Sequence, residues 1–182
     1  VNLKYQRRMK PIFVEFIKIL YGDNNQELFK DYIDVNKKEN VKGIVKDMFF
    51  ITHNEIEKDN NNINTYEAKY VAKLAQYLLR QGYKKDEILI LTFYDSQEKL
   101  IKQNIHDLGL KNLKVKSIDN YQGDEYNIVI LSLVESNPDL GINALNSFNK
   151  VYFSFTRAKI GFYIIGNINN IIKGNNLLKE KN

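Results

Sequence analysis

The sequence contains no cysteine and no tryptophan, and it has only two prolines and two histidines. Without cysteine the chain forms no disulfide and no thiolate metal site, which excludes the disulfide-rich secreted class. The two histidines, His53 and His106, are too few and too scattered for a zinc site, so we assign no metal ligand. No apolar run approaches the roughly 18 residues of a membrane helix, and the first residues lack a signal-peptide pattern. We expect an intracellular protein, cytoplasmic or nuclear.

The composition fits one globular domain. A length of 182 residues, 43% of them hydrophobic, is enough for one packed core. The net charge of +5 and the isoelectric point near 9.1 are compatible with a polyanionic partner, although such a balance is also common on solvated surfaces. The chain begins without methionine inside a basic segment, so we expect a domain excised from a longer protein.

Apolar runs alternate with helix signals along the chain. Pro11 opens an amphipathic helix, and Gly82 ends a later one. A short helix near the end is expected to carry Thr156 and Arg157. The segments predicted as strands are residues 48–51, 88–92, 112–118, 127–134 and 161–166. This alternation predicts a single α/β domain with a mainly parallel sheet of about five strands.

Two helix starts carry capping signatures. Asn64 stands three residues before Glu67, and Asp95 three residues before Glu98, as in a capping box. Ser96 lies within the second signature. We assign Asp95 and Ser96 to helix capping and to no other function.

Residues 117–134 form the stretch on which the functional prediction depends. A polar turn with Gly123 leads into an apolar run at residues 128–133, which is typical of a strand covered on both faces. The turn is therefore expected at the edge of a buried sheet, where α/β proteins commonly bind ligands. Residues 151–159 follow, with Arg157 before another apolar strand. Together the two segments predict a nucleotide site.

Five segments resemble the motifs of superfamily 1 helicases, in the family's order. Residues 6–11 (Gln-Arg-Arg-Met-Lys-Pro) are similar to motif IV, and residues 119–125 (Asp-Asn-Tyr-Gln-Gly-Asp-Glu) are similar to motif V. Residues 151–159, which end in Thr-Arg-Ala-Lys, resemble motif VI, and residues 64–68 and 92–97 match two further elements. The likeness is closest to the up-frameshift and senataxin-like group, within it to the branch that carries zinc-finger arrays and acts in RNA silencing.

The resemblance implies a RecA-like three-layer sandwich of the P-loop NTPase type, the second of two motor domains of an ATP-dependent RNA or DNA helicase. The sequence has no G-x-x-x-x-G-K-[ST] phosphate loop and no Asp-Glu pair after a strand to hold Mg²⁺. ATP is therefore expected between this domain and a first RecA-like domain outside the chain, which would hold the Mg²⁺. We expect residues 1–182 to form one domain that is inactive by itself, with single-stranded RNA or DNA as its partner.

The resemblance makes Arg157 the expected arginine finger and Arg8 a second one. Cleavage of the terminal phosphoryl group of ATP builds negative charge on its oxygens, and a guanidinium meets that charge with forked donors that stay protonated. The alternative is that each arginine simply extends into solvent, which is the usual place for arginine.

Four more residues are expected to bind the nucleotide. Gln6 belongs to motif IV, where Arg7 replaces the family's usual ring against the base and can itself stack. Glu125 would accept a hydrogen bond from a ribose hydroxyl, and Gly123 lets the backbone approach the nucleotide. The alternative for the last two is an ordinary solvated turn.

The resemblance assigns nucleic-acid contacts to Thr92, Ser117 and Gln122. The two hydroxyls would bond backbone phosphates, contacts that hold register and carry no sequence information. Gln122, which both donates and accepts, suits a switch between nucleotide and nucleic acid. The nearby lysines at positions 111, 114 and 116 fit the solvated face of an edge strand at least as well.

Two residues depart from the family pattern. Asn127 stands where many relatives have Asp, and Glu135 stands where many have Arg. These changes affect the nucleic-acid face and inter-domain salt bridges more than ATP binding. They leave an alternative open, a non-catalytic nucleic-acid-binding or protein-interaction module with a degenerate helicase fold.

Overall fold

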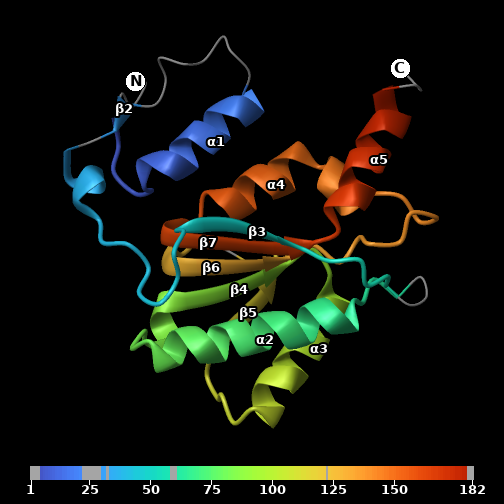
Figure 1. The fold of residues 1–182 in the computed structure, drawn as a ribbon, viewed down its shortest axis with the longest axis horizontal. Helices are drawn as coiled ribbons and strands as arrows, with labels where there is room; N and C mark the ends of the chain where they lie inside the picture. The colour runs from blue at the N-terminus through green and yellow to red at the C-terminus, as the bar shows by residue number, and fades with distance from the viewer. Residues whose placement is uncertain (1–4, 22–29, 32, 58–60, 122, 180–182) are drawn as a thin grey trace.

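The computed structural model describes residues 5–21, 30–31, 33–57, 61–121 and 123–179. Its middle layer is a parallel sheet with the strand order β3-β7-β6-β4-β5 (Figure 1). The strands are β3 (Met48–Thr52), β4 (Ile88–Thr92), β5 (Lys114–Ser117), β6 (Tyr126–Ser132) and β7 (Ala158–Gly166). All four neighbouring pairs run parallel. The predicted α/β fold with about five parallel strands is confirmed.

Helices cover both faces of this sheet, as Figure 1 shows. The bounds are α1 (Pro11–Tyr21), α4 (Phe148–Phe155) and α5 (Ile168–Lys179) on one side, with α2 (Thr65–Arg80) and α3 (Asp95–Asp107) on the other. The short pieces are β1 (Tyr5–Gln6), β2 (Lys30–Asp31), η2 (Ile33–Lys37), η3 (Lys85–Glu87) and η4 (Ala144–Asn146). The three-layer RecA-like arrangement follows from a sheet that is apolar on both faces.

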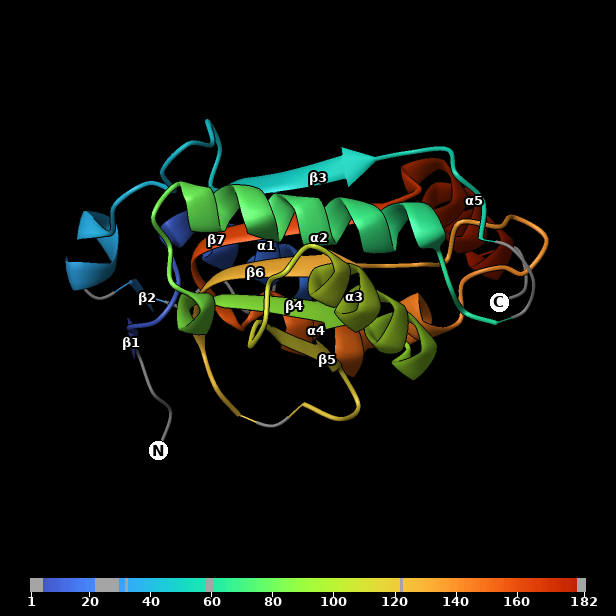
Figure 2. The same ribbon diagram turned by 90° about the horizontal axis from the view of Figure 1, so that it is seen from below.

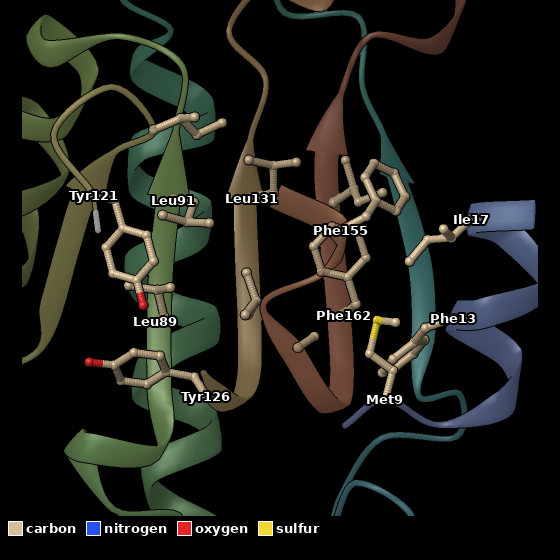
Figure 3. Packing of buried hydrophobic residues seen from close by; sticks show 14 of the residues in the cluster. Met9, Phe13, Ile17, Leu89, Leu91, Tyr121, Tyr126, Leu131, Phe155 and Phe162 are labelled. Atoms are coloured by element: carbon tan, nitrogen blue, oxygen red, sulfur yellow. The ribbon is translucent and has the colours of Figure 1, made fainter. Parts of the chain in front are cut away.

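Two apolar clusters hold the layers together, one on each face of the sheet. On the α1 and α4 side, Met9, Phe13 and Ile17 face Phe155 and Phe162 (Figure 3). Burying a side chain of this size contributes about 1.5–3 kcal/mol. This packing fixes the amino end of α1, and with it the motif IV turn, against α4 and β7.

The helix predicted to carry Thr156 and Arg157 ends two residues before Arg157. In the structure α4 stops at Phe155, Thr156 is its C-cap, and Arg157 lies in the turn before β7. β7 starts at Ala158, three residues before the predicted start at Gly161. The polar Lys159 interrupts the apolar pattern there, so the sequence does not mark the true beginning of the strand.

Only the first of the two capping signatures provides a cap. Asn64 is the N-cap of α2 and accepts from the backbone N–H of Glu67 at 3.0 Å, as predicted. Glu67 does not complete a capping box, because its carboxylate lies in a buried network described below. The N-cap of α3 is Tyr94, so the assignment of Asp95 as the cap is wrong. Its carboxylate instead accepts from Ser117 Oγ.

The connection from β5 to β6 crosses the sheet from one edge to the other. β5 and β6 both run parallel to β4, which lies between them, so the chain must return from the carboxyl end of β5 to the amino end of β6 (Figure 2). Tyr121 anchors this connection in the core at 5% exposure. The stretch at residues 117–134 therefore includes residues at the carboxyl edge of the sheet and residues at its amino edge.

Candidate functional site

The motif IV, V and VI segments meet at the amino ends of β6 and β7. The backbone N–H of Lys10 donates to the carbonyl of Lys159 at 3.2 Å, and that of Tyr126 donates to the carbonyl of Arg157 at 3.1 Å. These bonds tie together three segments that are far apart in the sequence. Ligands of open α/β sheets usually bind beyond the carboxyl ends of the strands. The turn around Gly123 lies at the opposite edge, so that part of the expectation is wrong.

Gln6 shapes the turn that presents Arg8. Its side-chain oxygen accepts from the backbone N–H groups of Arg8 at 3.0 Å and Met9 at 2.9 Å, and its amide donates to the carbonyl of Met9 at 2.8 Å. Its predicted nucleotide contact stays a prediction, as does that of the exposed Arg7. The Gln6 amide therefore both accepts and donates hydrogen bonds within one tight turn. No local sequence pattern predicts this role.

Arg8 and Glu125 form an ion pair at this edge. Arg8 Nη1 also donates to the carbonyl of Thr156 at 3.2 Å, and Lys159 Nζ lies 3.7 Å from Glu125 Oε2. The side chains of Arg8, Glu125 and Lys159 are each about one-third exposed. One carboxylate thus faces two cations that remain accessible to a ligand.

Arg157 lies beside Arg8 and is held in place by its own neighbours. Its Nη2 donates to Thr156 Oγ1 at 2.9 Å and its Nη1 to the carbonyl of Gly123 at 3.4 Å. Its guanidinium lies 4.4 Å from the centre of the Phe153 ring, a cation–π contact. Burial, and then the charge of Arg8, lower the pKa of Arg157. Arginine nevertheless stays charged. Arg8 and Arg157 therefore place two positive charges close together, and a bound anion would offset their repulsion.

The structure adds Lys38, which the sequence did not single out. Its Nζ donates to the backbone carbonyl of Arg8, and its pKa is lowered by burial and then by Lys159. Lys38 follows η2, in a polar segment without periodicity, and no pattern there distinguishes it from its neighbours. It adds a further cation to the Arg8, Arg157 and Lys159 group.

The predicted nucleic-acid residues lie at the other end of the sheet. Thr92 and Ser117 are paired neighbours at the carboxyl ends of β4 and β5, and both are 0% exposed. Thr92 Oγ1 is buried without a hydrogen-bond partner among the described residues, whereas Ser117 Oγ donates to Asp95. Their contact with phosphate stays a prediction. Because both side chains are fully buried, the residues that cover them would have to move first. Gln122 lies outside the described residues.

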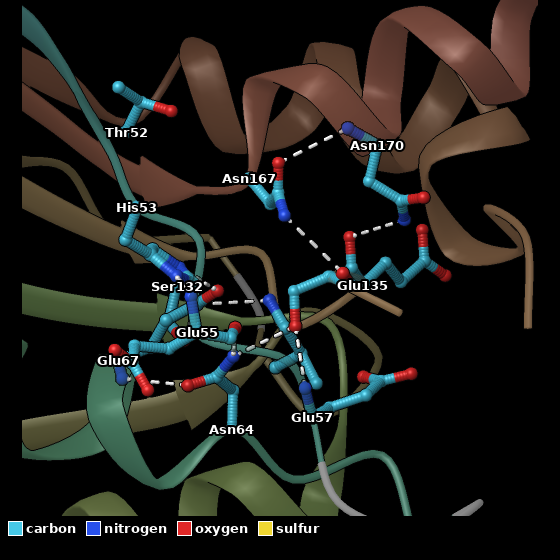
Figure 4. Close-up of polar contacts among 12 residues, drawn as sticks. Thr52, His53, Glu55, Glu57, Asn64, Glu67, Ser132, Glu135, Asn167 and Asn170 are labelled. Atoms are coloured by element: carbon cyan, nitrogen blue, oxygen red, sulfur yellow. Dashed lines mark hydrogen bonds and ion pairs between the residues drawn. The ribbon is translucent and has the colours of Figure 1, made fainter. Parts of the chain in front are cut away.

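A buried polar network, missed by the sequence analysis, occupies this carboxyl edge (Figure 4). Glu67 is 0% exposed and accepts from Ser132 Oγ at 2.6 Å and from the backbone N–H of Val134 at 2.9 Å. It also lies 2.9 Å from His53 Nε2. Val134 has a φ of 73°, a strained value for a β-branched residue. Glu67 therefore holds a sharp turn directly after β6.

The two departures from the family pattern have partners in the structure. Asn127 donates to Glu87 Oε1 at 2.6 Å. Glu135 is 3% exposed, and its carboxylate accepts from the Tyr94 hydroxyl and from three backbone N–H groups at the start of η4. Both residues are thus integrated into the fold of this chain.

No group of three or more His, Cys, Asp or Glu side chains suited to a metal ion occurs within the described ranges. None of the helices there combines the length and the apolarity that a membrane crossing needs.

A family model described as an AAA domain matches residues 1–169. NFX1-type zinc finger-containing protein 1 of Mus musculus is 36% identical over 95% of this chain and 9% of its own length. The helicase required for RNAi-mediated heterochromatin assembly 1 of Schizosaccharomyces pombe is 31% identical over 97% of this chain and 18% of its own length. Putative regulator of nonsense transcripts 1 of Takifugu rubripes is 35% identical over 72% and 13%, respectively. The chain thus spans less than a fifth of each of these relatives.

Proposed function

This chain belongs to the superfamily 1 helicases of the up-frameshift-like group, and on that basis we propose that it is the second RecA-like domain of an ATP-dependent helicase motor. In this proposal the nucleotide lies between the amino edge of the sheet and a first RecA-like domain that carries the phosphate loop and holds Mg²⁺. The observation that carries the proposal is the convergence of Arg8, Arg157 and Lys159 on one accessible edge.

Arg8 and Arg157 are proposed to contact the terminal phosphate of ATP. Before the nucleotide arrives, Glu125 balances the charge of Arg8. A phosphate group offers more acceptor oxygens and more charge than one carboxylate, so it competes for the guanidinium. Arg8 would then turn from Glu125 to the phosphate, leaving Glu125 able to accept from the ribose.

Nucleotide binding would close the cleft between the two domains, and loss of the terminal phosphate would let it open. Residues 118–125 connect this edge to the carboxyl edge with Thr92 and Ser117, where a single strand is proposed to bind. The names of two relatives refer to RNAi and to nonsense transcripts, which favours RNA over DNA. It also favours a nuclear or cytoplasmic location.

Replacing Arg8 tests this proposal in the full-length protein. We expect Arg8→Ala to lower kcat for ATP hydrolysis by about 10²-fold, because removing one preorganised donor to a developing charge typically has this effect. The matched control is Arg80→Ala, which removes an exposed arginine at the end of α2. Steady-state ATPase assays with single-stranded RNA compare the two. Equal rates for both variants would contradict the role of Arg8.

A further inference from the structure

A pocket of about 410 Å³ opens at the carboxyl edge of the sheet, at the far end from the arginine site. It is lined by three carboxylates together with tyrosine and asparagine side chains, including Glu57, Asn62, Tyr94, Glu135, Asp139 and Asn143. The described residues that line it include no lysine, arginine or histidine. The described lining of the pocket is therefore acidic, and the proposed nucleotide site does not account for it.

Glu57 is the residue that indicates a ligand. It is 5% exposed, and its Oε2 is buried without a hydrogen-bond partner among the described residues. Its backbone N–H donates to Ser136 Oγ at 2.8 Å, which fixes its position. Figure 4 shows the carboxylates of Glu57 and Glu135 pointing to the same side, away from the polar network. A buried acceptor left without a donor is unfavourable, so a ligand that brings a donor into the pocket would relieve that cost.

The chemistry of the pocket selects the class of donor. Glu135 already accepts from Tyr94 and from three backbone N–H groups, so its charge is largely offset. The unused acceptor capacity lies on Glu57, and Asp139 also lines the pocket. A metal ion needs several oxygen ligands that converge on one point, and no such group of acidic side chains occurs among the described residues. A phosphodiester would be repelled by the carboxylates. A guanidinium brings positive charge and two parallel donors that match one carboxylate.

We propose that this pocket binds an arginine side chain presented by a protein segment outside these 182 residues, with its guanidinium on the Glu57 carboxylate. The relatives extend far beyond the matched region, since the chain covers only 9% to 18% of their lengths, so such segments are available. This inference does not depend on the proposed motor function, because the pocket and the arginine site lie at opposite ends of the sheet.

The proposal has a pH signature. Burial, then Glu135, then Glu67 raise the pKa of Glu57 from 4.5 to about 7, and Asp139 and Tyr94 also face the pocket. A guanidinium binds the ionised carboxylate, so binding must displace the proton at low pH. With a pKa of about 7, roughly nine-tenths of the Glu57 side chains are ionised at about pH 8 and roughly one-tenth at about pH 6. The affinity for arginine is therefore expected to fall about tenfold over this range.

The test titrates the isotopically labelled 182-residue chain with the peptide acetyl-Gly-Arg-Gly-amide and follows the backbone amide signals by NMR. The matched ligand is the same peptide with citrulline, which has nearly the shape of arginine without its charge. We expect the arginine peptide to shift the signals of Glu57, Tyr94 and Asn143 and to bind at least about tenfold more tightly than the citrulline peptide. The affinity should fall about tenfold from about pH 8 to about pH 6.

Glu57→Gln should abolish both the binding and its pH dependence, whereas the exposed neighbour change Glu55→Gln should leave them intact. Glu57→Gln keeps the side-chain shape and removes a buried charge, so its spectrum should remain that of a folded chain. Failure of the arginine peptide to bind, or equal binding of the citrulline peptide, would overturn the proposal. So would single-stranded RNA shifting these signals where the arginine peptide does not, because the pocket would then be a nucleic-acid site.

Discussion

Arg157→Ala should lower ATP hydrolysis by the full-length protein by about 10³-fold or more while the protein stays folded. An arginine that reaches a neighbouring nucleotide contributes about 10³–10⁵ in rate in well-studied NTPases. Arg157 is suited to this role because Thr156 and the carbonyl of Gly123 already orient its guanidinium. Most of the lost free energy should therefore appear in kcat, with a smaller change in KM for ATP.

Two controls separate catalysis from folding. Arg157→Lys keeps the charge but loses the forked donors, so it should also lose most of the activity. Arg80→Ala removes an arginine elsewhere and should have little effect. Arg157 is half-buried at a turn, and its replacement removes one cation–π contact and a few hydrogen bonds, so thermal unfolding should shift only slightly. ATPase activity of Arg157→Ala within a few-fold of the wild type would show that Arg157 is not the finger.

Glu67→Ala should lower the free energy of unfolding by about 3–5 kcal/mol, the largest stability effect that we expect from one side chain. The change leaves Ser132 Oγ, the N–H of Val134 and His53 without their shared acceptor in a fully buried site. A buried hydrogen-bond donor left without its acceptor costs about 1–3 kcal/mol, and more than one is left here. It also frees the strained Val134 turn, so the loop that follows β6 should lose order first.

Urea unfolding followed by circular dichroism measures this effect. Lys73→Ala is the matched control, because it removes an exposed charge from the same helix and should change stability by less than about 0.5 kcal/mol. Glu67→Gln should lie between the two, since it keeps one acceptor oxygen. A loss below about 1 kcal/mol in Glu67→Ala would mean that the network does not hold the turn.

The sheet could be predicted from the sequence because its central strands are buried on both faces. Ile88–Thr92 and Tyr126–Ser132 read as apolar runs for that reason. The beginning of β7 was missed because Lys159 turns to Glu125 at the edge of the sheet, where polar side chains are allowed. The end of α4 was missed by two residues, which is within the usual uncertainty at a helix terminus.

Residues of the candidate site could be predicted where a local motif sets their role. They could not be predicted where contacts with distant segments of the chain set it. Spacing alone identified Asn64 as a cap, but Glu67 is recruited by residues on β3 and β6 that no local pattern reveals. Lys38 and Glu57 come from polar segments, and only the fold shows that Lys38 is half-buried and Glu57 buried. The sequence assigned nucleotide and nucleic-acid roles without their relative positions, whereas the strands place Arg157 and Thr92 at opposite edges of the sheet.

The central claim is that this chain supplies one half of a shared ATP site, and ATP hydrolysis by the 182-residue chain tests it most directly. Phosphate release is measured for the chain alone and for the full-length protein, each with single-stranded RNA present. The account predicts background hydrolysis by the chain alone and RNA-stimulated hydrolysis by the full-length protein. Robust turnover by the chain alone would contradict the account, because the site would then be complete without a neighbouring domain.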